Sequence, residues 1–91
     1  MNDQEKLQEM KTKMEKAVEQ YLVLSGINPK SEERKKRCEQ ITFGDNPETI
    51  AFTIDSFPVV WMEITEKQDK TLDIGLYSVD NTLLNSLKSI N

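Results

Sequence analysis

The 91-residue sequence contains no histidine and a single cysteine, and each shortage removes a class of function. Histidine is the commonest general base and the commonest metal ligand, so dyads and triads that depend on it cannot form. Cys38 has no second cysteine with which to form an internal disulfide, and this suits a reducing compartment. We therefore expect no enzymatic activity, no metal, no cofactor and a cytoplasmic location.

Long apolar runs are missing as well. No stretch approaches the roughly 20 apolar residues that cross a bilayer. Near the start, Asp3, Glu5 and Lys6 interrupt any apolar segment, so we expect neither a signal peptide nor a membrane span. The length fits one domain over residues 1–91.

Basic side chains are scarce in the second part of the chain. Residues 1–39 hold nine basic and eight acidic side chains, whereas residues 40–91 hold three basic and eight acidic ones. The formal net charge of −4 is therefore concentrated there. An acidic surface repels phosphates and favours basic partners.

Residues 4–25 have the periodicity of a long amphipathic helix. Apolar or nearly apolar side chains recur at alternating spacings of three and four: Leu7, Met10, Met14, Ala17, Tyr21 and Leu24. Val18 and Leu22 widen this stripe near its C-terminal end. This heptad seam predicts packing onto a sheet of the same chain, with pairing to a second copy as the alternative. Gly26 predicts the end of the helix.

Two shorter helices are expected. The first covers residues 29–39, with Asn28 or Ser31 as its cap and very little apolar surface. The second covers residues 82–90, where Asp80 or Asn81 can act as the cap. Its apolar stripe consists of Leu83, Leu84, Leu87 and Ile90.

Strand-like alternation dominates the region between these helices. Three segments alternate apolar and polar residues, through Ile50, Phe52 and Ile54, then Val60, Met62 and Ile64, then Leu72, Ile74 and Leu76. We predict strands at residues 48–55, 57–65 and 71–79, with a short first strand at 41–43. Pro58 suggests an edge position or a bulge. Short loops between the strands predict an antiparallel meander.

These elements define an α+β fold with two layers. We expect three or four antiparallel strands, with a long N-terminal helix, a short second helix and a C-terminal helix. The helices should cover the face that carries Ile50, Met62 and Ile74.

The opposite face of the sheet is the candidate site. Its predicted partner-binding residues are Trp61, Glu63, Asp73, Gly75 and Tyr77. Tryptophan and tyrosine offer large contact areas and anchor many interfaces, and a glycine lets a partner backbone approach. The alternative is that a helix crosses this face, or that the sheet curls and buries Trp61.

A basic run and scattered carboxylates are weaker signals. Residues 34–37 are all basic and suggest phosphate binding, but consecutive helical positions point in different directions and acidic residues flank them. A basic run of this kind can lower the pKa of the neighbouring Cys38 thiol, but no base accompanies that thiol, so a small packed residue is the favoured interpretation. Glu63 and Asp73 could face each other across two strands, but nothing else completes a metal site or an acid–base pair.

The sequence therefore favours a small, acidic, non-catalytic protein-binding module. It is similar in build to inhibitors, immunity proteins and phage or host-interaction proteins. The expected partner is a protein with basic or mixed charge, without nucleic acid or membrane. The alternative is a nucleic-acid-associated regulator that uses residues 34–37. We expect a monomer or a weak homodimer, formed through the N-terminal helix or through a sheet edge at residues 41–43 or at the strand with Pro58.

Overall fold

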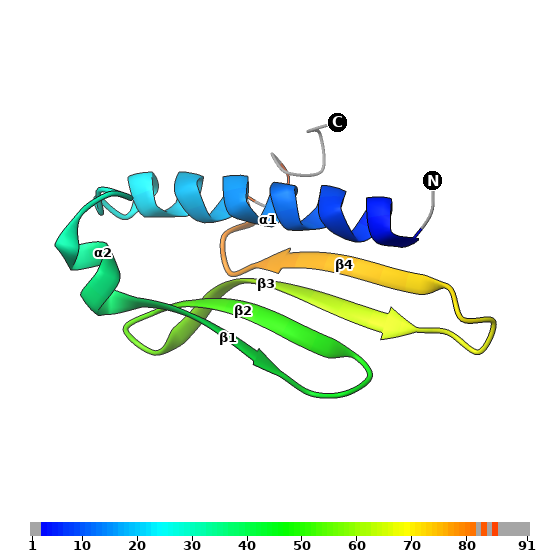
Figure 1. The fold of residues 1–91 in the computed structure, drawn as a ribbon. Coiled ribbons are helices and arrows are strands. Elements are labelled where there is room, and N and C mark those ends of the chain that lie inside the picture. Colours follow the sequence, from blue (N-terminus) through cyan, green and yellow to red (C-terminus); the bar gives the residue numbers. More distant parts are fainter. Residues whose placement is uncertain (1–2, 82, 84, 86–91) are drawn as a thin grey trace.

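A computed structural model describes residues 3–81, 83 and 85. The chain forms two helices, α1 (Asp3–Leu24) and α2 (Glu32–Arg37), and then four strands, β1 (Cys38–Phe43), β2 (Glu48–Ile54), β3 (Phe57–Glu66) and β4 (Leu72–Ser78). The strands form one antiparallel sheet in the order β1-β2-β3-β4. Helix α1 lies along one face of this sheet (Figure 1). The predicted α+β fold with an antiparallel meander is confirmed, with four strands.

Helix α1 ends as its sequence predicts. Gly26 has a φ of +76°, which suits glycine. The Ile27 N–H donates to the Leu22 carbonyl at 2.9 Å, and the Gly26 N–H donates to the Val23 carbonyl at 3.1 Å. These two bonds form a Schellman motif, and they turn Ile27 back into the core.

The buried stripe of α1 differs from the predicted heptad seam at its C-terminal end. Leu24 is 68% exposed, whereas Val18 and Leu22, which were predicted to widen the stripe, are buried beside Met14 and Ala17. A straight helix has 3.6 residues per turn, so a stripe with a 3.5-residue period drifts around it. The prediction of Leu24 as a core residue was therefore wrong.

The boundary between α2 and β1 lies earlier than predicted. The Ser31 hydroxyl caps α2 by accepting a hydrogen bond from the Arg34 N–H at 3.2 Å. Cys38 already has extended backbone angles, and it pairs with Ile54 of β2. Residues 38 and 39 thus belong to a strand and not to the helix predicted over 29–39, because pairing with β2 outweighs their local preference.

The connection between β2 and β3 is a tight turn at Asp55 and Ser56. Both residues have positive φ, +52° and +72°, which is the signature of a type I′ hairpin turn. Just beyond it, Phe52 pairs with Val60 but Thr53 pairs with Pro58. This irregularity confirms the predicted bulge at Pro58. The strand with Pro58 lies inside the sheet, so its suspected edge position was wrong.

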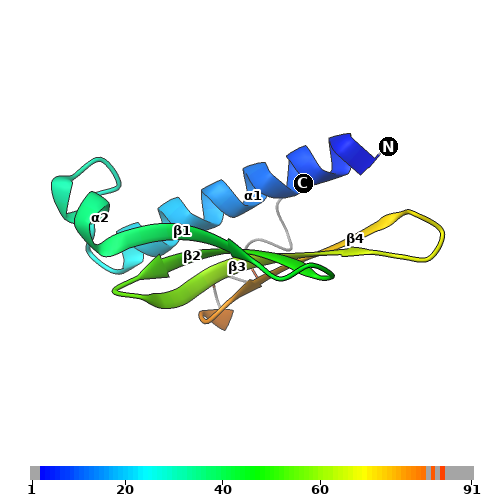
Figure 2. The same cartoon turned by 60° about the horizontal axis from the view of Figure 1, so that its bottom comes forward.

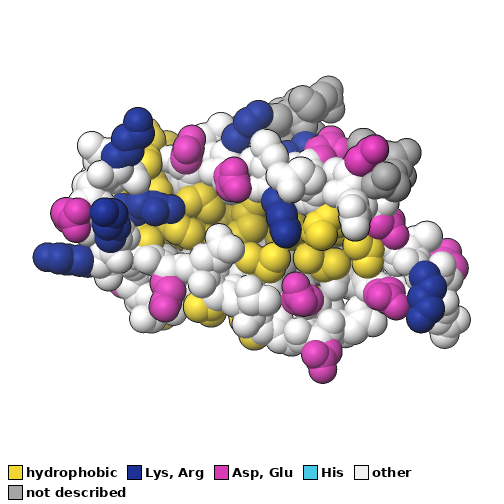
Figure 3. Space-filling model, in the orientation of Figure 1, with side chains coloured by type: hydrophobic (Ala, Val, Ile, Leu, Met, Phe, Trp, Pro, Cys, Tyr) yellow, Lys and Arg dark blue, Asp and Glu magenta, His cyan; other side chains and the backbone are white. Residues whose placement is uncertain are grey.

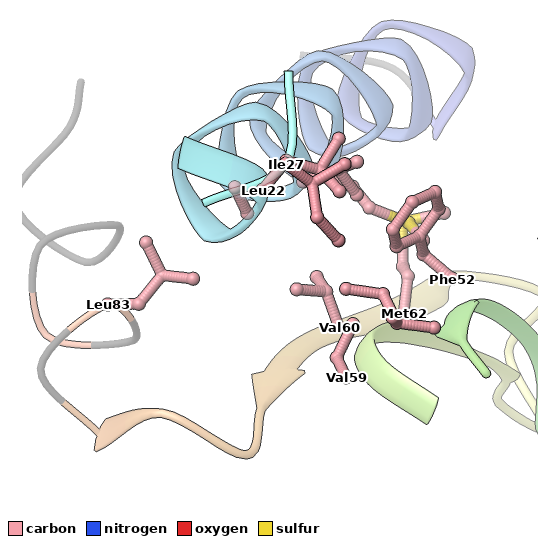
Figure 4. Packing of buried hydrophobic residues seen from close by; sticks show 11 residues of the cluster. Leu22, Ile27, Phe52, Val59, Val60, Met62 and Leu83 are labelled. Atoms are coloured by element: carbon pink, nitrogen blue, oxygen red, sulfur yellow. The ribbon is translucent and has the colours of Figure 1, made fainter. Parts of the chain in front are cut away.

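The core lies between α1 and the sheet. Leu22, Val60 and Met62 are completely buried, and Phe52 and Ile27 pack with them (Figure 4). The predicted core residues Ile50 and Ile74 are half-buried against this cluster.

The end of the core is formed by Leu83. This residue is buried against the same cluster, and its N–H donates to the Asp80 carboxylate at 2.9 Å, as at a helix cap. Of the helix predicted over residues 82–90, only residues 83 and 85 are described, and the rest lies outside the described residues.

Candidate functional site

The face of the sheet opposite α1 is open. Helix α1 lies on the other side of the sheet, and α2 lies at the end of the sheet beside the start of β1, in two views related by a rotation (Figures 1 and 2). The sequence left open the alternative that a helix crosses this face. Within the described residues no helix does so. We call it the outer face.

One row of side chains crosses all four strands on the outer face. The strand register places Ile41 opposite Ala51, Ala51 opposite Trp61, and Trp61 opposite Tyr77. The rings of Trp61 and Tyr77 are stacked, with centroids 5.9 Å apart and an interplanar angle of 17°. Ala51 is only 1% exposed, since it lies between larger neighbours, and Tyr77 remains 41% exposed. The two aromatic residues predicted for the site therefore form one rigid pair.

Glu63 orients this pair. The Trp61 Nε1–H donates to the Glu63 Oε2 at 3.2 Å, and both side chains are half-buried. The indole N–H is thus satisfied within the chain. The tryptophan consequently offers apolar ring surface to a partner, while the carboxylate keeps its remaining acceptor sites.

Gly75 has a different role from the predicted one. A Cβ atom at this position would lie 2.6 Å from the Tyr77 hydroxyl oxygen and 2.8 Å from a ring carbon. The Tyr77 ring therefore occupies the space that was predicted to admit a partner backbone. Gly75 is needed here because it lets Tyr77 lie flat along its own strand, toward Trp61.

Asp73 lies on the same face but apart from Glu63. The register pairs Asp73 with Thr65 and Glu63 with Gly75, so the two carboxylates are diagonal and not directly opposite. Within the described residues no group of three or more aspartate, glutamate or cysteine side chains could hold a metal ion. The geometry thus provides acidic charge beside the aromatic pair.

The charge of the sheet has a single sign. The four strands contain no lysine or arginine and five acidic residues, of which Glu39, Glu63 and Asp73 lie on the outer face. The outer face therefore combines stacked aromatic rings with uncompensated negative charge.

Sequence reasoning missed two further residues of this face. Ile41 and Phe43 extend the apolar row to β1, and Phe43 is 54% exposed. Their two-residue alternation was visible in the sequence. The predicted strand 41–43 was too short for its register to be assigned, and the pairing with β2 now fixes it.

A groove on the helical side was also missed. Helix α1 makes its main contacts with β3 and β4, and a groove remains between α1 and the side of the sheet formed by β1 and β2. Hydrophobic side chains gather in a band between α1 and the sheet (Figure 3). The groove has a volume of about 720 Å³, and its lining includes Met14, Val18, Gln40, Thr42, Ile50 and Phe52. It depends on where α1 crosses the sheet, which local patterns do not encode.

The basic run is largely engaged within the chain. The Arg34 guanidinium lies 5.8 Å from the centre of the Phe52 ring. Lys35 pairs with Glu32 at 3.4 Å. Arg37 donates two hydrogen bonds to the Asp55 carboxylate, at 3.0 and 2.7 Å. These residues therefore point in different directions and do not form one phosphate-binding surface.

Cys38 is partly buried and packs against the core cluster. Partial burial raises the pKa of its thiol, and the nearby arginines offset this effect only in part. The basic run does not lower this pKa, because burial outweighs the attraction of the arginines, and the packing of Cys38 against the core agrees with the favoured interpretation as a small packed residue. A thiol of this kind is a weak nucleophile.

Comparison with known proteins adds no relative. A scan against protein-family models, a search of curated proteins and a search of solved structures each find no match to this chain. In the part of the chain that the structure describes, no helix combines the length and apolar character required to cross a membrane.

Proposed function

We propose that this protein is a small, non-catalytic protein-binding module that uses the outer face of its sheet. The observation that supports this most is the stacked pair of Trp61 and Tyr77 on a face that no helix among the described residues covers. Large aromatic groups at the centre of an exposed surface are typical anchors of protein interfaces. A contiguous apolar patch with a polar rim marks an interaction site more often than a solvated surface.

The charge of the face favours a partner with basic or mixed charge. Glu39, Glu63 and Asp73 have no basic neighbour on the same face of the four strands. Their field would steer a basic surface toward the aromatic pair and would make association sensitive to salt. The same field opposes nucleic acid. The internal partners of Arg34, Lys35 and Arg37 weaken the alternative of a nucleic-acid regulator.

Affinity capture with paired baits tests this proposal. The baits are the wild type, the double variant Trp61→Ala/Tyr77→Ala, and a control, Val23→Ser/Leu24→Ser. The control removes exposed apolar side chains at the end of α1, away from the sheet. Each bait is first checked for a native circular-dichroism spectrum, because only folded baits are informative.

The expected result is a partner retained by the wild type and the control and lost with the double variant. Trp61→Ala alone should weaken purified partner binding by about 2 kcal/mol or more, as expected for an interface anchor. Equal retention by all three baits would show that the outer face is not the binding surface.

A further inference from the structure

The two edges of the sheet differ in how they are protected. At the β4 edge, the Lys6 ammonium from α1 donates a hydrogen bond to the Leu72 carbonyl at 2.9 Å. Helix α1 makes its main contacts with β3 and β4, on the side of the sheet away from β1. The β1 edge is exposed along Glu39–Phe43. An exposed edge is a template for another strand.

The register identifies which backbone groups of β1 are free to pair. The Asp55 N–H donates to the Arg37 carbonyl at 2.8 Å, and the next residue, Cys38, lies opposite Ile54. In an antiparallel ladder, hydrogen-bonded and non-hydrogen-bonded pairs alternate. The odd-numbered residues of β1 therefore bond to β2, and Gln40 and Thr42 direct their N–H and C=O groups outward.

The usual devices that prevent strand addition are missing from β1. The strand has no lysine, no proline and no bulge, and Glu39 is its one charged residue. Natural edge strands are commonly protected by such features. Their absence on one edge, together with the lysine cap on the other edge, favours β1 as the pairing edge.

The surroundings of β1 select the side chains of an added strand. On the helical side, Gln40 and Thr42 border the groove that contains Met14, Ile50 and Phe52. The charges along that groove nearly balance, with Lys11, Lys30 and Arg34 against Glu15 and Glu19. On the outer face, by contrast, the strands provide only acidic charge, and Ile41 and Phe43 can support the stems of long basic side chains.

We infer that the partner contributes an extended segment that pairs with β1 as a fifth strand and alternates apolar and basic residues. Its apolar side chains enter the groove, and its basic side chains lie along the outer face beside Glu39. Backbone hydrogen bonds give affinity and the alternating side chains give specificity, as in other cases of strand addition. This inference rests on the function proposed above, because it assigns a chemistry to the same partner.

A pair of isomeric peptides tests the inference. The probe is a seven-residue peptide, acetylated and amidated, in which lysine and valine alternate and lysine is at both ends. Opposite residues of neighbouring strands share a face, so the valines should lie opposite Gln40 and Thr42 and provide the hydrogen bonds. One isomer is N-methylated at the three valines, and the other is N-methylated at three lysines. Both keep the same charge and mass.

The measurement is amide exchange by nuclear magnetic resonance, together with peptide affinity. We expect the parent peptide to protect the N–H groups of Gln40 and Thr42, which are free in the isolated protein. The N–H groups of Ile41 and Phe43 are already bonded to β2 and should change little. Methylation at the valines should weaken binding by about tenfold or more, because it removes the backbone hydrogen bonds to Gln40 and Thr42. Methylation at the lysines should leave binding nearly intact.

Three other outcomes would overturn the inference. Equal binding of the two isomers would mean that charge alone attracts the peptides. Absence of binding by the parent peptide would mean that β1 does not accept such a strand. Protection of Gln40 and Thr42 that rises with protein concentration, without peptide, would show that a second copy occupies the edge. None of these results involves Trp61 or Tyr77, so the outer-face proposal is judged separately by its capture experiment.

Discussion

The two faces of the sheet should respond very differently to the loss of one aromatic side chain. Phe52 points toward α1 and is only 4% exposed, within the core cluster. Trp61 lies on the outer face, half-buried, with its ring against Tyr77. The larger side chain should therefore be the less costly one to remove.

The magnitudes follow from these environments. Phe52→Ala leaves a cavity beneath α1 and should cost about 3–5 kcal/mol of unfolding free energy. Trp61→Ala loses one aromatic stack, worth about 0.5–1.5 kcal/mol, and part of the cover over Ala51. We expect a total of about 1–2 kcal/mol for Trp61→Ala. Trp61→Phe keeps a ring beside Tyr77 and should cost less than Trp61→Ala.

Urea unfolding followed by far-ultraviolet circular dichroism measures both costs without using tryptophan fluorescence. The wild type, Phe52→Ala, Trp61→Ala and Trp61→Phe are compared under the same conditions. If Trp61→Ala costs as much as Phe52→Ala, Trp61 anchors a core and the assignment of an open outer face is refuted.

Three further predictions concern local geometry. Ser56→Gly should stabilise the protein by about 0.5–1 kcal/mol in urea unfolding, because Ser56 has a φ of +72°; Ser56→Ala keeps the strain and should give no such gain. The Arg37 guanidinium lowers the pKa of Asp55 from 3.8, so stability that is fully present above that value is lost as the pH falls through the lower folded pKa. Asp55→Asn, which tolerates positive φ, should flatten the acid limb of the stability curve; an unchanged limb would contradict this. Gly75→Ala should displace the Tyr77 ring and reduce the near-ultraviolet circular-dichroism signal of the aromatic pair, at a cost of about 1 kcal/mol; an unchanged signal would contradict the close contact.

Local patterns predicted most of the fold. The alternation through Ile50, Met62 and Ile74 assigned the correct face to the core, and Gly26 ended α1 as expected. The predicted boundaries of helices and strands were less accurate where pairing between strands sets the boundary. Residues 38–40 follow a helix-like basic run, yet they pair with β2 because the register of the hairpin continues through them.

The composition of the site was only partly predictable. Trp61 and Tyr77 were placed together by strand period alone, and the register confirms that they are opposite each other. The Tyr77 ring fills the space above Gly75 only in one side-chain rotamer. The pattern of residues along the chain does not specify that rotamer. The groove depends on the position at which α1 crosses the sheet, which residue patterns along the chain do not specify.

Site-specific photo-crosslinking tests the central claim most directly. Tyr77 is replaced by a photoreactive phenylalanine analogue, which keeps an aromatic ring, and the same analogue replaces Val23 on exposed α1 surface as a matched control. Both variants are irradiated in extracts of the cells that make the protein. We predict one discrete crosslinked product from position 77, weakened by high salt and absent from position 23. No product from position 77, or the same product from both positions, would contradict the claim that the outer face binds the partner.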